Sequence, residues 1–173
     1  GPLGAVPVAL GARVVRVRVP ARWRRIHAQE EDSEKNRPPP KSTFHQVMVA
    51  VGDGGTVLRS QDDGAHWKLV ETATRAELRC VKLHSTSGTW IAAGADGTVL
   101  RSTDAARTWT RIPPPSRALL ASLSVESVSG TFLIAGEDGA LLRSEDAGLH
   151  WQQVQDVTAE AITSLIGPDK HGS

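Results

Sequence analysis

The sequence is poor in several features, and each absence excludes a class of protein. It has a single cysteine, so an intramolecular disulfide is excluded and the core must be stable without one. No apolar run approaches the roughly 20 residues that a membrane-spanning helix needs. Tyrosine is absent, which removes any mechanism with a tyrosine nucleophile. Acidic residues are missing from positions 1–29, which carry six arginines, so the remaining residues sum to a charge of −5.

The main feature that is present is a repeat with a period of 42 residues. Three copies align without a gap, beginning at Gly52, Gly94 and Gly136 and ending at Trp67, Trp109 and Trp151. A constant period in this range, made of short strands and glycine turns, is typical of propeller blades. The repeat therefore predicts the class of fold, and says much less about function.

Each repeat is expected to form four strands separated by turn residues. The second strand of each repeat is apolar on successive residues, which indicates burial on both faces. Neighbouring sheets of the same kind would supply that cover. The expected fold is therefore all-β: a partial β-propeller of four-stranded antiparallel blades with Asp-box turns, about three blades plus remnants. The strands expected in the second and third repeats are residues 78–83, 89–93, 98–102 and 109–112, then 120–125, 132–135, 141–144 and 151–154.

The turn between the third and fourth strands carries the motif Ser-x-Asp-x-Gly-x-x-Trp, and we expect a structural role for it. A short Asp side chain accepts backbone N–H bonds within its own turn, Gly permits positive φ, and Trp buries a large surface between blades. The middle copy has Ala106 in place of Gly, which should cost about 1 kcal/mol if that position needs positive φ. The motif residues are Ser60, Asp62, Gly64, Trp67, Ser102, Asp104, Trp109, Ser144, Asp146, Gly148 and Trp151.

The chain is expected to have three parts. Residues 1–42 are an Arg-rich N-terminal segment with a Pro-rich linker, 43–167 are the repeats, and 168–173 are a tail. Within the second part the repeats are expected at about 43–70, 77–112 and 119–154, followed by a partial strand at 160–166 that matches the first strand of one more repeat.

The N-terminal segment allows two interpretations. Residues 14–19 alternate Val and Arg like a strand, and residues 23–26 are similar to 109–112, so a degenerate strand around 13–26 could end a preceding blade. The alternative is a basic presequence for organelle import. By register, the first strand of the first repeat should fall on residues 36–40. Three consecutive prolines there cannot donate to a central ladder, so this strand is expected to be absent or replaced by a linker.

On these motifs the chain resembles the Asp-box (BNR) repeat, and residues 50–67 are most similar to the photosystem II stability/assembly factor family. The resemblance covers about residues 47–166. It implies a relative of seven-bladed propellers that help to build membrane protein complexes without catalysis. The chain would then be a non-enzymatic interaction or assembly scaffold with protein partners, such as a membrane complex or its subunits, and no cofactor. By the same resemblance it would be an exported protein of the thylakoid lumen or periplasm.

Two other functions stay open, and the first is a carbohydrate-binding or sialidase-like propeller. Sialidases carry the same repeat, but their chemistry needs a Tyr nucleophile that this sequence lacks. The tripeptide Arg111-Ile112-Pro113 is similar to a sialidase signature, yet it lies at the end of a fourth strand, and we interpret it as coincidence. The second is a structural subunit of a large complex. The acidic balance outside the N-terminal segment argues against a nucleic-acid partner.

Candidate binding residues follow from the repeat. Arg59, Arg101 and Arg143 recur just before the Asp turn and would suit carboxylate or phosphate groups of a partner. The alternative is that each arginine pairs with an acid of the adjacent turn, such as Asp62. No metal site is expected, because one histidine per blade does not converge. An open arc of blades leaves two sheet faces uncovered, so we expect further blades outside this sequence, self-association to complete the propeller, or docking to a larger assembly.

Overall fold

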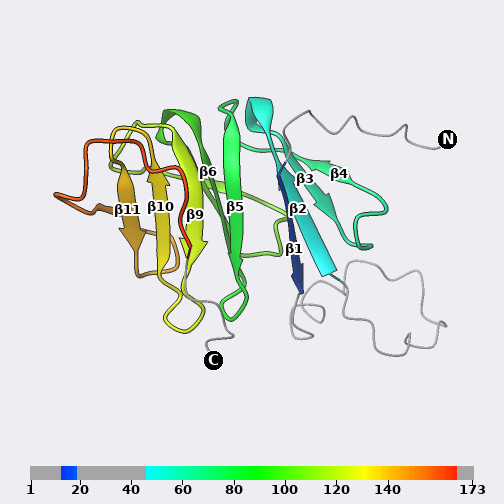
Figure 1. Cartoon of the computed structure of the whole chain (residues 1–173). Helices are drawn as coiled ribbons and strands as arrows, with labels where there is room; N and C mark the ends of the chain where they lie inside the picture. The colour runs from blue at the N-terminus through cyan, green and yellow to red at the C-terminus, as the bar shows by residue number, and fades with distance from the viewer. Residues whose placement is uncertain (1–12, 19–45, 167–173) are drawn as a thin grey trace, which may run out of the picture.

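The computed structural model describes residues 13–18 and 46–166, which form three four-stranded antiparallel sheets, each a blade. Figure 1 shows them in chain order from the cyan through the green to the yellow and orange sheet. The expected all-β partial propeller is confirmed.

Blade 1 is β1 (Arg13–Arg18), β2 (Gln46–Val51), β3 (Val57–Ser60) and β4 (Lys68–Val70). Blade 2 is β5 (Leu78–His84), β6 (Thr89–Gly94), β7 (Val99–Ser102) and β8 (Thr110–Ile112). Blade 3 is β9 (Leu120–Val125), β10 (Phe132–Gly136), β11 (Leu141–Ser144) and β12 (Gln152–Gln153).

The sequence period is also the period of strand pairing. The second and third strands pair Met48 with Ser60 in blade 1, Trp90 with Ser102 in blade 2, and Phe132 with Ser144 in blade 3. Because the register is identical when shifted by 42 residues, each blade places equivalent side chains at equivalent positions of its sheet.

The first strand position of blade 1 differs from expectation. It is filled by β1, which pairs antiparallel with β2 from Arg13↔Val51 to Arg18↔Gln46. The strand at 13–18 therefore belongs to blade 1 and not to a preceding blade, and the position expected to be empty is occupied. The physical reason is that every residue of β1 has a backbone N–H, whereas Pro38, Pro39 and Pro40 have none. Those prolines and residues 23–26 lie outside the described part of the chain.

The core lies between the blades rather than within one of them. One buried cluster joins Val49 and Val57 of blade 1 to Trp90 of blade 2, and a second joins Ile91 of blade 2 to Phe132 of blade 3. All six residues of β6 are buried. Two consecutive residues of this strand face different blades, since Trp90 packs against blade 1 and Ile91 packs against blade 3. Each such side chain contributes roughly 1.5–3 kcal/mol when fully buried. Stability therefore depends on blade stacking.

The turn between the second and third strands and the crossover to the next blade meet at one rim, the crossover rim. The turns are η2 (Asp53–Gly55) in blade 1 and η3 (Ala95–Gly97) in blade 2. The amide N of Gly55 donates to the carbonyl of Ala76 at 2.9 Å, and the N of Gly97 to that of Ala118 at 3.0 Å. The Asp-box turns lie at the other end of the strands. The second-to-third-strand turns of blades 1 and 2 are thus each tied to the crossover that leads into the following blade.

Residues 160–166, expected to hold a partial strand, have no strand assignment. Their start nevertheless follows the repeat, since Ile162 N donates to the Gly136 carbonyl at 2.8 Å as Leu78 N donates to the Gly52 carbonyl at 2.9 Å. Leu165 N also donates to Ser122 Oγ at 2.9 Å. The segment therefore lies against blade 3 where the first strand of another blade would begin.

Candidate functional site: the Asp-box turns and the arginines between blades

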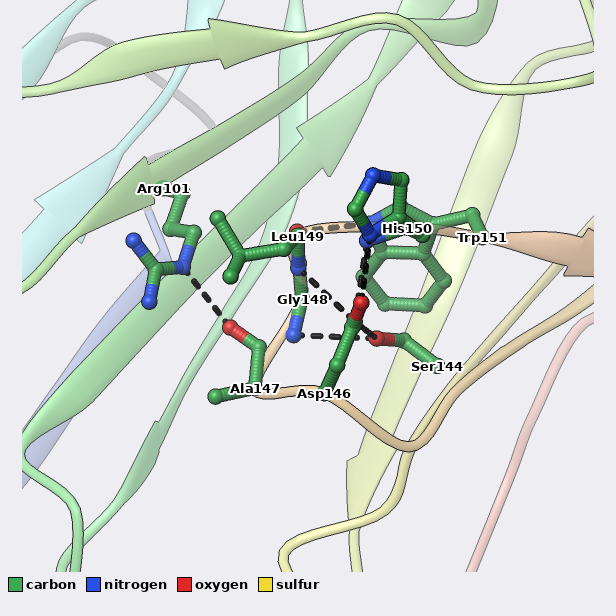
Figure 2. Close-up of polar contacts among 8 residues, drawn as sticks. All are labelled: Arg101, Ser144, Asp146, Ala147, Gly148, Leu149, His150 and Trp151. Carbon is green, nitrogen blue, oxygen red and sulfur yellow. Dashed lines mark hydrogen bonds and ion pairs between the residues drawn. The ribbon is translucent and has the colours of Figure 1, made fainter.

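The Asp-box turn of blade 3 is a closed network of hydrogen bonds (Figure 2). Ser144 Oγ donates to Asp146 Oδ1 at 2.9 Å, and the amide N of Gly148 donates back to Ser144 Oγ at 2.9 Å. The amide N of His150 donates to Asp146 Oδ1 at 2.9 Å, and Trp151 Nε1 donates to the Gly148 carbonyl at 3.1 Å. The carboxylate is therefore used within its own turn and holds the Trp that packs between blades.

Blade 1 has the same network. Ser60 Oγ donates to Asp62 Oδ1 at 2.8 Å, the amide N of His66 donates to Asp62 Oδ1 at 2.9 Å, and Trp67 Nε1 donates to the Gly64 carbonyl at 3.0 Å. Both histidine rings also lie 2.6 Å from their Asp carboxylates, and both are 88% exposed. These histidines therefore extend the hydrogen-bond network of the turn.

The turn of blade 2 departs from this pattern where the Gly is missing. Ala106 adopts φ 62°, close to Gly148 at 77°, so this position does require the left-handed region. Thr108 replaces the histidine and donates through N and Oγ1 to the two carboxylate oxygens of Asp104, at 3.0 and 2.5 Å. Trp109 Nε1 is buried and has no hydrogen-bond partner among the described residues. The middle turn is therefore the weakest of the three.

The difference at position 106 has a packing reason. A Cβ added to Gly148 would lie 2.4 Å from Cδ1 of Ile91 in the preceding blade. The residue equivalent to Ile91 one blade earlier is Val49, which has no Cδ1 and shares a buried cluster with Ala106. Blade 1 thus leaves room for the methyl group that blade 2 does not allow.

The hydrogen bonds keep the carboxylates of these turns ionised. The backbone N–H of His66, then its ring and the Ser60 hydroxyl, lower the pKa of Asp62 from 3.8 to about 2. The backbone N–H of His150 is the largest cause that lowers the pKa of Asp146. Burial acts to raise the pKa of Asp104, but the bonds from Thr108 and Ser102 outweigh it and the pKa is lowered.

Acid should therefore destabilise the fold through these turns. A carboxyl group whose folded pKa is depressed contributes stability above its unfolded pKa, and this is lost as pH falls through the folded pKa. For Asp62 the window runs from about pH 4 down to about pH 2. We expect the urea midpoint to fall across this window in the wild type and to fall less in Asp62→Asn.

The matched control for the acid experiment is Asp138→Asn. Asp138 is exposed at the crossover rim, and its φ of 54° suits Asn as well as Asp. It should retain the wild-type pH dependence. An equal flattening in both variants would mean that the Asp-box bonds do not govern acid unfolding.

The repeated arginines join successive blades. Arg59 Nε donates to the carbonyl of Ala105 in the Asp-box turn of blade 2, and Arg101 Nε donates to the carbonyl of Ala147 in that of blade 3, both at 2.7 Å. Figure 2 shows the second of these contacts. Burial, followed by the charge of Arg107, lowers the pKa of Arg59 to about 10. Two of the three candidate arginines therefore have a role in the scaffold.

Arg143 differs from the other two. Its Nη2 donates to Glu145 Oε1 at 2.6 Å, and its side chain is 42% exposed. The alternative expectation, an ion pair with an acid of the adjacent turn, describes Arg143 but not Arg59 or Arg101. A partner-binding role for all three remains a prediction.

Sequence reasoning missed a second pair of arginines with the same spacing. Arg75 and Arg117 stand 42 residues apart on the crossovers, and both are exposed. Each lies between residues fixed by hydrogen bonds: Ala76 N donates to Thr74 Oγ1 at 3.0 Å, and Ala118 N to Ser116 Oγ at 3.1 Å. The equal spacing was a signal that could have found them.

Metal-ligating side chains do not cluster in the described part of the chain. No three or more His, Cys, Asp or Glu side chains converge there on a common point. The single cysteine, Cys80, is buried. Within the same residues, no helix has the length and apolar character needed to cross a membrane.

Comparisons with known proteins bear on the family and the fold. A model of the family described as photosynthesis system II assembly factor YCF48 matches residues 42–167. A solved structure described as YCF48 bound to D1 peptide is similar with a TM-score of 0.53 and 20% identity, over 62% of this chain and 35% of that one. The chain thus spans about a third of that protein, and the similarity shows the fold. No curated protein matches the chain.

Proposed function

The chain belongs to the family described as photosynthesis system II assembly factor YCF48, and on this premise we propose that it is a non-catalytic scaffold that binds a peptide segment of a membrane-complex subunit. The observation that carries the proposal is the family match, which runs through all three Asp-box turns. The solved relative that binds a D1 peptide supports the chemical class of the partner. Neither comparison favours the carbohydrate-processing alternative.

We place the peptide at the crossover rim. Arg75 and Arg117 are exposed there at equivalent positions of two successive crossovers, with their backbone held by neighbouring hydrogen bonds. A guanidinium group suits a peptide carboxylate through two parallel hydrogen bonds. By contrast, the Nε groups of Arg59 and Arg101 are already bonded to the next blade.

The expected result is saturable binding of a D1-derived peptide, measured by fluorescence anisotropy. The double variant Arg75→Ala, Arg117→Ala should weaken affinity at least about tenfold, because each charge-assisted bond contributes roughly 1.5–3 kcal/mol. The matched control is Arg143→Ala, an exposed arginine at the other rim, which should bind like the wild type.

A peptide of shuffled sequence tests whether binding reflects charge alone. Absence of saturable binding to the wild-type chain would remove the proposed function. Weakening by Arg143→Ala, with no effect of the crossover variants, would move the site to the Asp-box rim.

The proposal has a second part, which is that copies of this chain associate with one another. It is supported by one face of blade 3, where Leu133, Leu141 and Val154 are half-buried, whereas their blade 2 equivalents Ile91, Val99 and Ile112 are packed against blade 3.

A further inference from the structure

The structure describes three crossovers, and all three are built on the same turn. In each, a Ser or Thr hydroxyl accepts the amide N–H of the residue two positions later, at 3.0 Å in the first, 3.1 Å in the second and 3.0 Å in the third. The carbonyl of the same Ser or Thr lies against a glycine of the adjacent strand turn, where a Cβ has no room. The hydroxyl residues are Thr74, Ser116 and Thr158, and the glycines are Gly55, Gly97 and Gly139. Each blade therefore presents the exposed residues of its crossover in the same way.

The residue between the hydroxyl group and the donated amide is the tip of this turn. It is Arg75 in the first crossover, Arg117 in the second and Ala159 in the third, and all three are exposed. Two positions before the tip, each crossover carries an exposed apolar residue, and the one in the third crossover, Val157, is 48% exposed. The third tip is therefore apolar where the first two are basic.

The third tip also differs from the second in its charged neighbours. Residues 155–161 and the adjoining turn, 137–139, contain four exposed acids and neither Lys nor Arg. The equivalent residues around the second tip, 113–119 and 95–97, contain one acid and one arginine. The four acids around the third tip are Glu137, Asp138, Asp156 and Glu160.

Around the first tip the acids are partly compensated. Glu77 is paired with Arg79 at 2.6 Å, and Arg75 offsets one of the two remaining acids, Asp53 and Glu71. A carboxylate of a ligand thus meets a guanidinium group at each of the first two tips, and only charges of its own sign at the third.

We infer that the third crossover sets the specificity of the peptide site, because it rejects a carboxylate and receives an apolar side chain on Val157 and Ala159. This rests on the proposed function, which places a peptide along the crossover rim. The favoured peptide has its acidic residues in one half, over Arg75 and Arg117, and apolar residues in the other half, over the third crossover. Covering Val157 removes apolar surface from water, and the four acids act against ligands that would bind through negative charge alone.

The test is fluorescence anisotropy with short synthetic peptides of equal length. The split peptide has aspartates in one half and leucines in the other, and it is made in both chain directions. The second peptide has aspartates in both halves, so binding through charge alone would favour it. We expect the better of the two split peptides to bind the wild-type chain at least about fivefold tighter than the all-aspartate peptide.

Two variants at the exposed surface of blade 3 locate the apolar contact. Val157→Ser should remove the advantage of the split peptide and leave binding of the all-aspartate peptide unchanged. Leu149→Ser is the matched control, because Leu149 is 46% exposed on the Asp-box rim of the same blade, and it should keep the wild-type preference.

A third variant, Ala159→Arg, should reverse the preference. It gives the third tip the residue that the other two tips have, so the turn can hold it, and unchanged thermal melting would show that the variant is folded. The all-aspartate peptide should bind this variant at least about fivefold tighter than it binds the wild type, because each added guanidinium group can hold a carboxylate. The split peptide should gain nothing.

Three results would overturn the inference. They are tighter binding of the all-aspartate peptide by the wild type, a split-peptide advantage that survives Val157→Ser, and tighter binding still when lysines replace the leucines, which would mean that the acids take a base. In each case, binding that is lost in the double variant Arg75→Ala, Arg117→Ala leaves the proposed function standing. Absence of saturable binding to every synthetic peptide also overturns the inference, and the peptide experiment described for the proposed function then decides that proposal on its own.

Discussion

Replacing Gly94 by alanine is expected to lower the free energy of unfolding by about 3 kcal/mol or more. Gly94 ends β6 in an extended conformation that any residue can adopt, so the reason is space. A Cβ there would lie 1.9 Å from the carbonyl oxygen of Glu77 on the crossover and 2.8 Å from Leu78 Cα. Both are backbone atoms and cannot move aside like the end of a side chain. The same carbonyl accepts a bond from Ala95 N at 2.8 Å, which would be broken. Urea unfolding followed by circular dichroism measures the loss.

Gly54→Ala is the matched control for this experiment. Gly54 has φ 64°, and an added Cβ would meet nothing within 4 Å. Its equivalents are Asp96 and Asp138, which adopt φ 55° and 54° with full side chains. The cost should therefore be only conformational, about 1 kcal/mol. If both alanine variants lost the same stability, close approach to the crossover would not be the reason for glycine at position 94.

The strands and Asp-box turns were predictable because each is specified by side chains close together in sequence. Alternation, turn residues and apolar runs act within a few residues of one another. A constant period then transfers an assignment from one copy to the next. The prediction of β6 as a strand buried on both faces needed only its own residues and the knowledge that sheets stack.

The parts that were not predictable depend on partners distant in the chain. The strand that fills the first position of blade 1 is separated from β2 by a segment of 27 residues, 19–45, and nothing local specifies this pairing. The acceptors of Arg59 and Arg101 are backbone carbonyls, which every residue has, so no residue type marks them. Opposite charges nearby made an ion pair with Asp62 the natural expectation, although that carboxylate is already bound to Ser60 and His66.

The contact between blades 2 and 3 should be lost in Arg101→Ala, with a decrease of about 1.5–3 kcal/mol in the free energy of unfolding. The Nε–H bond to the Ala147 carbonyl disappears, and so does the packing of the arginine stem against the next Asp-box turn. Arg101→Lys should rescue only part of the loss, because an ammonium on a flexible stem does not reproduce the planar guanidinium. Arg143→Ala is the matched control, because the only hydrogen-bond partner of Arg143 among the described residues is the exposed Glu145. We expect no measurable change in its free energy of unfolding under conditions in which the chain is monomeric.

The way in which stability is lost should show where the contact acts. In an array of repeats, stability is approximately a sum of terms for each repeat and for each interface between neighbours. Removing Arg101 weakens one interface and leaves the interior of each blade unchanged. Amide protons of β10 and β11 should therefore exchange earlier than those of β2 and β3, whereas in Arg59→Ala the order should reverse. Uniform acceleration across all three blades would mean that the arginines stabilise the arc as a whole.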